Sequence, residues 1–373
     1  MATTDTSIVT SIRARPGLSI IAVVGLLFLI DLLAKLAGVA VGPLGGSLSA
    51  GRLGSNLWNG LVIGIVIGLA GIGLSMTYSI LSFANFSHGD LVSTGAFTGW
   101  GVAFVITAFG DAPFRALITV RGAGDVSSGA IGAHVLTAPA AVFVGLFAAF
   151  VITALIALVL DQLFYKPMRD RSGISLLIAS IGVALVVRYI LQFVYGSSRR
   201  GVTASVDTSN LVFAPLGLSI NAHQLTIVVA GVGLMVAMHF MLQHTKLGTA
   251  MRAMADNKDL ALVTGIPAER VVTATWLIGG GLAGASGYLY VLLRGTIQFD
   301  FGWLLLLLMF AAVILGGIGS VYGAIAGGIV IGIVFTTSTI WIPSDFNEAA
   351  AFAVMIVVLL IRPEGIFGGV STA

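Results

Sequence analysis

The sequence predicts an all-α, polytopic integral membrane protein with about ten transmembrane helices. Hydrophobic residues make up 58% of the 373 residues and charged residues only 9%, with a mean hydropathy of +1.08, far outside the range of soluble globular domains. Apolar runs of about 20 residues, the length that a helix needs to cross a bilayer, recur along the chain. Because these runs are apolar on every side, they exclude the alternating strands of a membrane barrel.

The predicted spans follow one another without a long linker, so residues 18–361 are expected to form one transmembrane domain. Some runs are short or interrupted by glycine, and the predicted number of spans is therefore eight to ten. The segments are 18–41, 57–81, 90–109, 137–160, 174–195, 224–243, 271–293, 303–318, 323–342 and 348–361.

The distribution of charge sets the predicted orientation. With ten spans and a cytoplasmic N-terminus, ten of the 18 basic residues lie inside and six outside, which agrees with the positive-inside rule. Both termini are then cytoplasmic, with tails at 1–17 and 362–373. The tetrapeptide GLAG occurs at 68–71 and again at 281–284, in two segments of opposite direction. This echo predicts an inverted repeat that relates spans two to five to spans seven to ten.

Glycine is abundant inside the predicted spans as well as between them. Of the 49 glycines, many lie in 277–287 and 315–328. One interpretation is close packing of helices, which small residues allow. The other is that GGIGSVYG breaks a helix at membrane depth, which requires surrounding protein or a water-filled cavity. The residues concerned are Gly316, Gly317, Gly319 and Gly323.

Polar residues between two spans mark a candidate translocation path. The stretch SFANFSHGD (82–90) places Asn85, His88 and Asp90 where almost no polar loop separates the second span from the third. Such residues are costly inside a membrane and are therefore functional candidates. Three interpretations are open: a solvated cytoplasmic turn, a buried His88 bonded to a neighbouring carbonyl group, or a discontinuous element that lines the path.

Three further charges need explanation within the spans. Asp31 and Lys35 are one helical turn apart and are predicted to form an ion pair with each other. Arg188 needs a partner or a water-filled cavity, and the sequence identifies neither.

The sequence shows no constellation typical of an enzyme. It contains no HExxH, no GxSxG and no cysteine. A GxxxxGK[ST] phosphate loop is also missing, so we expect the chain to bind neither ATP nor a metal or other cofactor. No nucleic-acid partner is expected, and membrane lipid is the surrounding medium.

A cytoplasmic segment at 244–270 concentrates charge in this apolar chain. Seven of the 33 charged residues lie between positions 246 and 270. Good helix formers run from Thr249 to Thr264, and Gly265 and Pro267 are expected to end the helix. This surface helix could rest on lipid headgroups, but its mixed charge favours docking to a cytoplasmic protein. One predicted face holds Arg252, Asp256, Asp259 and Val263, and another holds Met251, Met254, Ala255 and Leu262.

Several stretches resemble the branched-chain amino acid permeases of ABC importers. Asp259-Leu260-Ala261, three residues and Gly265 are similar to their EAAxxxG coupling motif, within a loop (245–271) that resembles theirs. SFANFSHGD resembles the NFAHGE signature of the subfamily that is paired with a second, related permease. The stretches 162–185, 311–328 and 361–368 resemble further recurring blocks, so the resemblance runs from about 57 to 368. Asp259 and Leu260 depart from the usual Glu and Ala, and 110–136 looks like an external insertion.

The resemblance implies a permease subunit in the cytoplasmic membrane of a prokaryote. Its partners would be a second homologous permease, two cytoplasmic ATPases that hydrolyse ATP, and an external substrate-binding protein. Its cargo would be a branched-chain or related amino acid, with urea or an amide as the alternative within the family. A less favoured alternative is an ion-coupled secondary transporter that uses Asp31, Asp90 or Arg188. The expected contacts with the ATPase are Arg252, Asp256, Asp259, Ala261 and Gly265.

Overall fold

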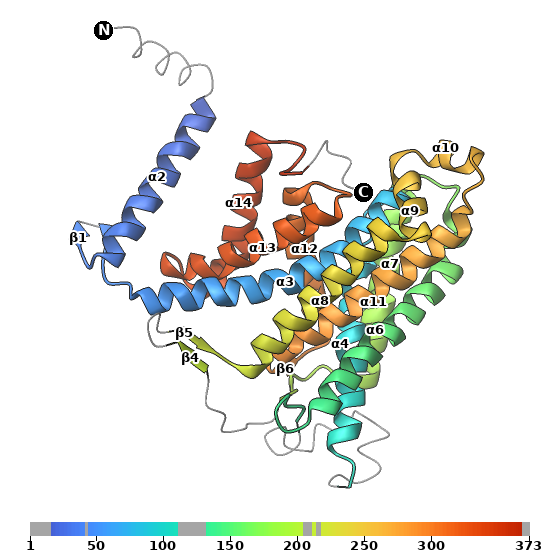
Figure 1. Ribbon diagram of the computed structural model, residues 1–373, viewed down its shortest axis with the longest axis horizontal. Helices are drawn as coiled ribbons and strands as arrows, with labels where there is room; N and C mark the ends of the chain where they lie inside the picture. Colours follow the sequence, from blue (N-terminus) through green and yellow to red (C-terminus); the bar gives the residue numbers. More distant parts are fainter. Residues whose placement is uncertain (1–15, 42–43, 111–131, 204–210, 214–217, 368–373) are drawn as a thin grey trace.

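Helices form most of the protein. The computed structural model describes residues 16–41, 44–110, 132–203, 211–213 and 218–367 (Figure 1). Most of the expected insertion at 110–136 and parts of both tails lie outside these ranges. The long apolar helices are α2 (Pro16–Leu36), α3 (Ala50–Leu81), α4 (Ser87–Thr107), α6 (Pro139–Leu160), α7 (Gly173–Tyr195), α8 (Ala222–His244), α11 (Ala268–Arg294), α12 (Phe301–Gly316), α13 (Val321–Thr337) and α14 (Asn347–Ile361).

Eight of the described helices are long and apolar enough to cross a membrane. The helix α12 is shorter, with 16 residues, and α2 is a further apolar helix of 21 residues. The predicted all-α, polytopic architecture is therefore confirmed, and the number of helices agrees with the expected eight to ten spans.

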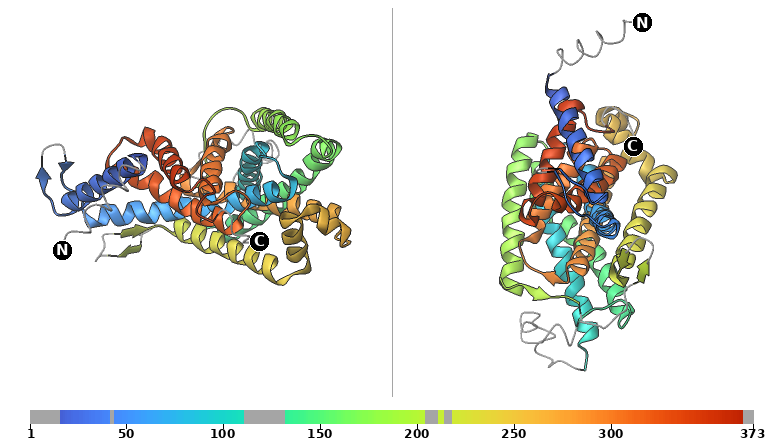
Figure 2. Two further views of the ribbon diagram at one scale, coloured as in Figure 1. Left: turned by 90° about the horizontal axis from the view of Figure 1, so that it is seen from above. Right: turned by 90° about the vertical axis from the view of Figure 1, so that its left-hand side faces the viewer.

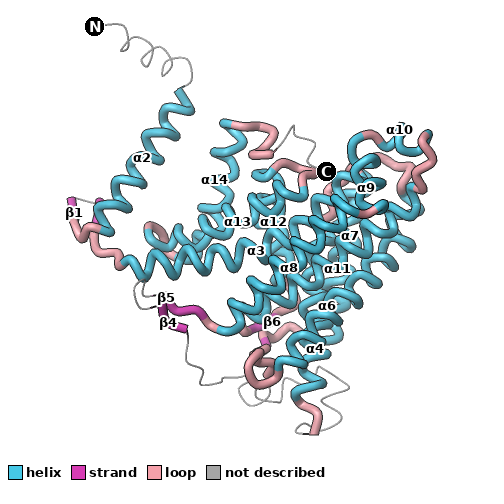
Figure 3. The backbone as a smooth tube through the Cα atoms, in the orientation of Figure 1, coloured by secondary structure: helices cyan, strands magenta, loops and turns pink. Residues whose placement is uncertain are grey.

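The remaining elements are short. Two helices, α9 (Lys246–Asp256) and α10 (Lys258–Val263), project from one end of the long helices, whereas β4, β5 and β6 lie at the other end (Figure 3). Single turns follow α6 and α13: η2 (Asp161–Tyr165), η3 (Lys166–Met168), η5 (Ser338–Ile340) and η6 (Ser344–Phe346). The antiparallel strand pairs are β1 (Ala40–Val41) with β2 (Leu44–Gly45), β3 (Arg200–Gly201) with β6 (Thr296–Ile297), and β4 (Leu211–Phe213) with β5 (Leu218–Ile220).

Two antiparallel helices, α3 and α11, form the centre of the fold. Gly73 of α3 lies against Gly279 of α11, and Ser286 donates to the carbonyl oxygen of Val66 at 2.8 Å, so the two helices run in opposite directions. In their most apolar stretches 94% of α3 and 78% of α11 is buried, compared with 33% of α7 and 28% of α8. Figure 2 shows α7 and α8 on opposite sides of the central pair. These two helices therefore belong to the outer layer.

Each central helix packs mainly on helices from the other half of the chain. The helix α3 packs along α12 and α13, whereas α11 packs along α4 and α6. In addition, α4 packs on α6 as α12 packs on α13. The glycines of the GLAG echo take part on both sides, because Gly68 faces Gly328 of α13 and Gly284 faces Ala149 of α6. The two halves therefore make matching contacts. This agrees with the predicted inverted repeat, which relates α3, α4, α6 and α7 to α11–α14.

The glycines of 316–323 form the turn between α12 and α13. Gly317 and Gly319 have φ angles of +107° and +89°, which residues with a side chain rarely adopt. A Cβ added to Gly316 would collide with the backbone of Gly323, so close packing and a helix break both apply here. The depth of this break in the membrane stays a prediction. Ser79, in the last turn of α3, donates to the Gly319 carbonyl oxygen at 2.8 Å, which places the turn at the end of the helices near α9 and not midway along them.

The last described residues cover the end of α12. The backbone N–H groups of Ile366 and Phe367 donate to the carbonyl oxygens of Leu315 and Gly316, at 2.8 and 3.0 Å. Gly365, with φ of +82°, lies directly against the backbone of Gly317 in the turn between α12 and α13. These bonds satisfy carbonyl groups that the end of a helix leaves unpaired.

The ion pair predicted in the first span is confirmed. Lys35 Nζ lies 2.5 Å from Asp31 Oδ2. Trp341 Nε1 donates to the same carboxylate oxygen at 2.7 Å. The pair therefore also fastens α2 to the segment that follows α13.

Candidate functional site

The start of α4 lies inside the layer of helices. Residues 82–86 leave the end of α3 and turn back, with Ser82 in the left-handed conformation at φ 57°. His88, in the first turn of α4, has its Nε2 2.9 Å from the carbonyl oxygen of Ala70. Ala70 precedes the end of α3 at Leu81 by three turns, about 16 Å along the helix axis. The stretch SFANFSHGD therefore begins α4 inside the protein, below the end of α3.

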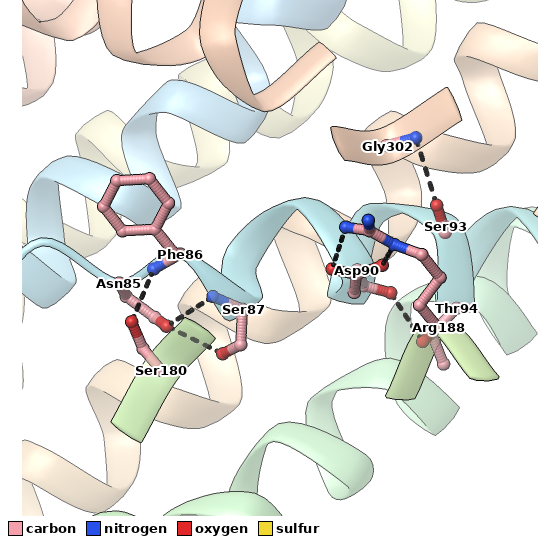
Figure 4. A network of polar contacts seen from close by, with 9 residues as sticks. All are labelled: Asn85, Phe86, Ser87, Asp90, Ser93, Thr94, Ser180, Arg188 and Gly302. Carbon is pink, nitrogen blue, oxygen red and sulfur yellow. Dashed lines mark hydrogen bonds and ion pairs between the residues drawn. The ribbon is translucent and has the colours of Figure 1, made fainter. Parts of the chain in front are cut away.

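Asn85 organises the polar contacts at this helix start (Figure 4). Its Oδ1 accepts hydrogen bonds from the backbone N–H and the hydroxyl of Ser87, at 3.1 and 2.7 Å. The Tyr165 hydroxyl, from η2, lies 2.8 Å from the Ser87 hydroxyl and 3.4 Å from Asn85 Oδ1. The backbone N–H of Phe86 donates to the Ser180 hydroxyl of α7 at 3.0 Å. Residues from α4, α7 and η2 thus meet in one buried polar cluster.

Arg188 forms an ion pair with Asp90, which lies about one turn into α4. Its Nε and Nη2 donate to the two carboxylate oxygens of Asp90, both at 3.0 Å, in the parallel geometry that guanidinium and carboxylate favour (Figure 4). Asp90 is fully buried, and the Arg188 guanidinium also lies 4.7 Å from the ring centre of Trp303. The ion pair and the aromatic face together compensate two charges that would otherwise be very costly at this depth.

Burial decides between two of the interpretations of this stretch. Asn85, His88 and Asp90 are 0%, 1% and 0% exposed, so a solvated turn is wrong. The histidine bonded to a neighbouring carbonyl group is what the structure shows for His88. A role of the three residues in a translocation path stays a prediction.

The charged segment at 244–270 differs from the single helix that was expected. The helix is interrupted at Asn257, whose extended backbone ends α9. The side chain of the same residue accepts a hydrogen bond from the Leu260 N–H at 2.9 Å and so caps the start of α10. The expected continuous faces therefore do not exist. Met251 and Met254 are buried, but Leu262, which was predicted to lie on the same face, is 46% exposed.

The charged side chains of this segment differ in their exposure. Arg252 donates to the Gln243 side chain at 2.9 Å and so contacts its own chain. Asp256 and Asp259 are exposed, at the end of α9 and the start of α10. Of the expected docking residues, Asp256, Asp259 and Gly265 are exposed, and the docking role itself stays a prediction.

The end of α10 is confirmed at Gly265. This residue has φ of +85°, and the N–H of Ile266 donates to the carbonyl oxygen of Ala261 at 3.0 Å, as in a helix end closed by glycine. Ala261 is buried against the protein, whereas the neighbouring Leu260 and Val263 are 61% and 86% exposed. The sequence did not predict an exposed apolar surface on α10, because charged residues lie close to its leucines and valine along the segment.

A salt-bridge network was also missed from the sequence. Arg169, after η3, contacts Asp161 at 2.6 Å and Glu269 at 2.7 Å, and Lys166 lies 3.3 Å from Glu269. The basic residues of 165–173 are visible in the sequence, but Glu269, one of their acidic partners, lies 100 positions from Arg169. Among the described residues, no group of three or more His, Cys, Asp and Glu side chains is placed to hold a metal ion.

The chain is similar to known transport proteins over most of its length. Residues 56–359 match the family model described as branched-chain amino acid transport system / permease component. The high-affinity branched-chain amino acid transport system permease protein LivH of Escherichia coli K12 is 28% identical over 314 residues, which cover 84% of this chain and 94% of that protein. BraD of Pseudomonas aeruginosa, a permease protein of the same description, is 26% identical over 315 residues, covering 84% and 94%.

A third relative is a probable permease protein of the same description. The probable branched-chain amino acid transport permease protein LivH of Methanocaldococcus jannaschii is 27% identical over 316 residues, which cover 80% of this chain and 88% of that protein. No solved structure matches the chain.

Proposed function

Because this chain belongs to the family of branched-chain amino acid transport system permease components, we propose that it moves branched-chain or related amino acids through the membrane as one subunit of an ABC importer. The observation that carries this proposal is the family match over 56–359, which includes both the buried polar cluster and the α9–α10 segment. The names of the relatives support the class of substrate.

We propose α10 as the contact with a cytoplasmic ATPase. It exposes Leu260, Leu262 and Val263 and packs chiefly on α9, so its outer surface is open to a partner. Apolar residues with an adjacent acid, Asp259, suit the core and rim of a protein interface better than a surface in water. A second homologous permease and an external substrate-binding protein complete the proposed assembly.

In this assembly the ATPases bind and hydrolyse ATP, and this chain needs no cofactor. ATP-driven closure of the ATPases displaces α10, and the displacement passes to the long helices through α9 and through the start of α11. The buried cluster at the start of α4 then lines one side of the path that opens alternately to the two sides of the membrane.

The test of this function is uptake by vesicles that contain the chain reconstituted with its partner subunits. We expect uptake of leucine, isoleucine or valine that requires ATP and persists when ion gradients are collapsed. Uptake that stops with the ion gradient while ATP remains would identify a secondary transporter instead. Competition by urea or short amides, without competition by leucine, would change the class of substrate.

The docking surface predicts the effect of a charge reversal on α10. Asp259→Lys should weaken the association with the ATPase, because a reversed charge inside an interface costs on the order of 2–5 kcal/mol, which is tens- to thousands-fold in affinity. The measurement is co-purification of the ATPase with the permease. Lys246→Glu, an equal reversal at the exposed start of α9, is the control and should retain the ATPase. Equal retention by both variants would show that α10 rests on lipid.

The proposed orientation can be checked with single cysteines, because the native chain has none. Lys258 lines the same pocket as Leu176 near the start of α7, whereas Ser198 follows the other end of that helix, about 30 Å away. In intact cells an impermeant thiol reagent should label Ser198→Cys and spare Lys258→Cys. The reverse pattern would invert the topology.

A further inference from the structure

Arg169 joins the cytoplasmic segment to the buried side of the protein. Its Nη1 donates to Glu269 Oε1 at 2.7 Å, and its Nη2 donates to Asp161 Oδ2 at 2.6 Å. Glu269 lies in the first turn of α11, four positions after the glycine that ends α10, and is 62% exposed. Asp161 lies at the end of α6 and is completely buried. One guanidinium group therefore spans the boundary between surface and interior.

Asp161 opens a π-helical turn, η2, which ends at Tyr165. Such turns insert an extra residue into an α-helix, are rare, and occur frequently at functional sites. Here the turn carries the Tyr165 hydroxyl to Ser87 at 2.8 Å, and its ring stacks on Trp276 of α11 with ring centres 4.8 Å apart. The contacts are thus continuous from Glu269 through η2 to the start of α4.

The interior end of this chain of contacts has unused hydrogen-bonding groups. Asn85 Nδ2, Trp276 Nε1 and Asp161 Oδ1 are buried and have no hydrogen-bond partner among the described residues. Buried polar groups are paired in nearly all proteins, and a partly satisfied network gains by rearranging. A second arrangement that pairs these groups is the kind of two-state element through which one site can influence another.

There is also space for such a rearrangement. A pocket of about 90 Å³ lies beside the link, and its lining includes Tyr165, Arg169, Glu269 and Lys258 of α10. A water molecule needs about 10–15 Å³, so this pocket has room for several, and the side chains along it can move without opening a new cavity.

We propose that Arg169 is a positioning residue that couples displacement of the α9–α10 segment to the buried polar cluster at the start of α4. The guanidinium holds the two carboxylates of Asp161 and Glu269 together, so movement of α11 at Glu269 displaces η2 and with it Tyr165. This proposal rests on the proposed function, since the displacement is the one that the ATPase imposes.

The experiment measures ATP hydrolysis and leucine uptake by the reconstituted transporter, and the result is the number of leucines moved for each ATP. In Arg169→Ala we expect the ATPase to remain bound and ATP hydrolysis to continue, while uptake per ATP falls about tenfold, within the range for residues along a coupled network. Arg169→Lys should recover part of the loss, because a lysine reaches one carboxylate at a time. Lys166→Ala is the matched control: it removes an exposed contact to the same Glu269 and should leave the ratio unchanged.

A second variant keeps the proposal testable if Arg169→Ala does not fold. Glu269→Gln changes an exposed group, and we expect it to lower uptake per ATP several-fold; an unchanged ratio overturns the proposal. Tyr165→Phe combined with Glu269→Gln should be no worse than the poorer single variant, whereas additive losses would show that the two residues act separately. Failure of the wild-type chain to show ATP-dependent uptake would contradict the proposed function itself, and a working wild type with a normal Arg169→Ala ratio contradicts only the coupling.

Discussion

Arg188→Met is expected to reduce sharply the yield of folded protein and to abolish uptake. The substitution removes both hydrogen bonds to Asp90 and leaves a carboxylate that is 0% exposed without its counter-charge. Removing one partner of a buried ion pair costs about 3–5 kcal/mol, which is about two to four orders of magnitude in a folding equilibrium. The measurement is the fraction of monodisperse protein after extraction in detergent, together with its melting temperature.

The matched control removes both charges. Asp90→Leu combined with Arg188→Met should restore the folded yield, because a buried ion pair replaced by apolar residues of similar volume is often neutral for stability. If this double variant folds but does not transport, the ion pair serves the translocation path; if it transports normally, the pair is structural. A wild-type yield and melting temperature in Arg188→Met alone would contradict the prediction.

Gly95→Val should prevent α4 from reaching its place beside α11. A Cβ at Gly95 would overlap the backbone of Gly284, and no side-chain rotation relieves a clash with backbone. Overpacking of a tight core costs about 1–3 kcal/mol where side chains can yield, and more where two helices must separate. We therefore expect near-complete loss of monodisperse protein, measured by size-exclusion chromatography.

The control for Gly95→Val is the same change at Gly182. That glycine lies within α7, and a Cβ there would meet no atom within 4 Å. Both variants carry the same cost in helix propensity. The difference between their yields of monodisperse protein therefore reports the close contact of α4 with α11. Equal yields of the two variants would show that the close approach of these helices is dispensable.

The spans could be predicted because each is apolar over its whole length, but their ends could not. The helix α3 begins at Ala50, whereas its predicted start was 57. Residues 50–56 are too polar for a hydropathy argument, and tertiary contacts hold them in the helix. Asn56 makes two of these contacts: its side chain donates to Thr339 at 3.3 Å, and its carbonyl oxygen accepts from Thr336 at 2.7 Å.

The buried cluster could be predicted only in part, for a similar reason. Asn85, His88 and Asp90 were candidates because polar residues between apolar spans are costly wherever they lie. Their partners come from distant parts of the chain: Arg188 is 98 positions from Asp90, and Tyr165 is 78 from Ser87. No periodicity within one span identifies a partner on another.

The break between α9 and α10, by contrast, was visible in the sequence. Asn257 precedes Lys-Asp-Leu, and asparagine is among the most favoured residues at the start of a helix. Good helix formers on both sides of Asn257 nevertheless favour one continuous helix. The capped break turns α10 into a separate short helix that exposes Leu260 and Val263.

The cover that residues 365–367 place over the end of α12 has a consequence for the order of folding. These residues follow α14 in the chain, yet the carbonyl groups of Leu315 and Gly316 accept hydrogen bonds from them. Buried backbone carbonyl groups are paired in nearly all proteins, so the end of α12 gains these partners only when the segment after α14 has reached it. The end of α12 is therefore completed by a later part of the chain than the helix itself.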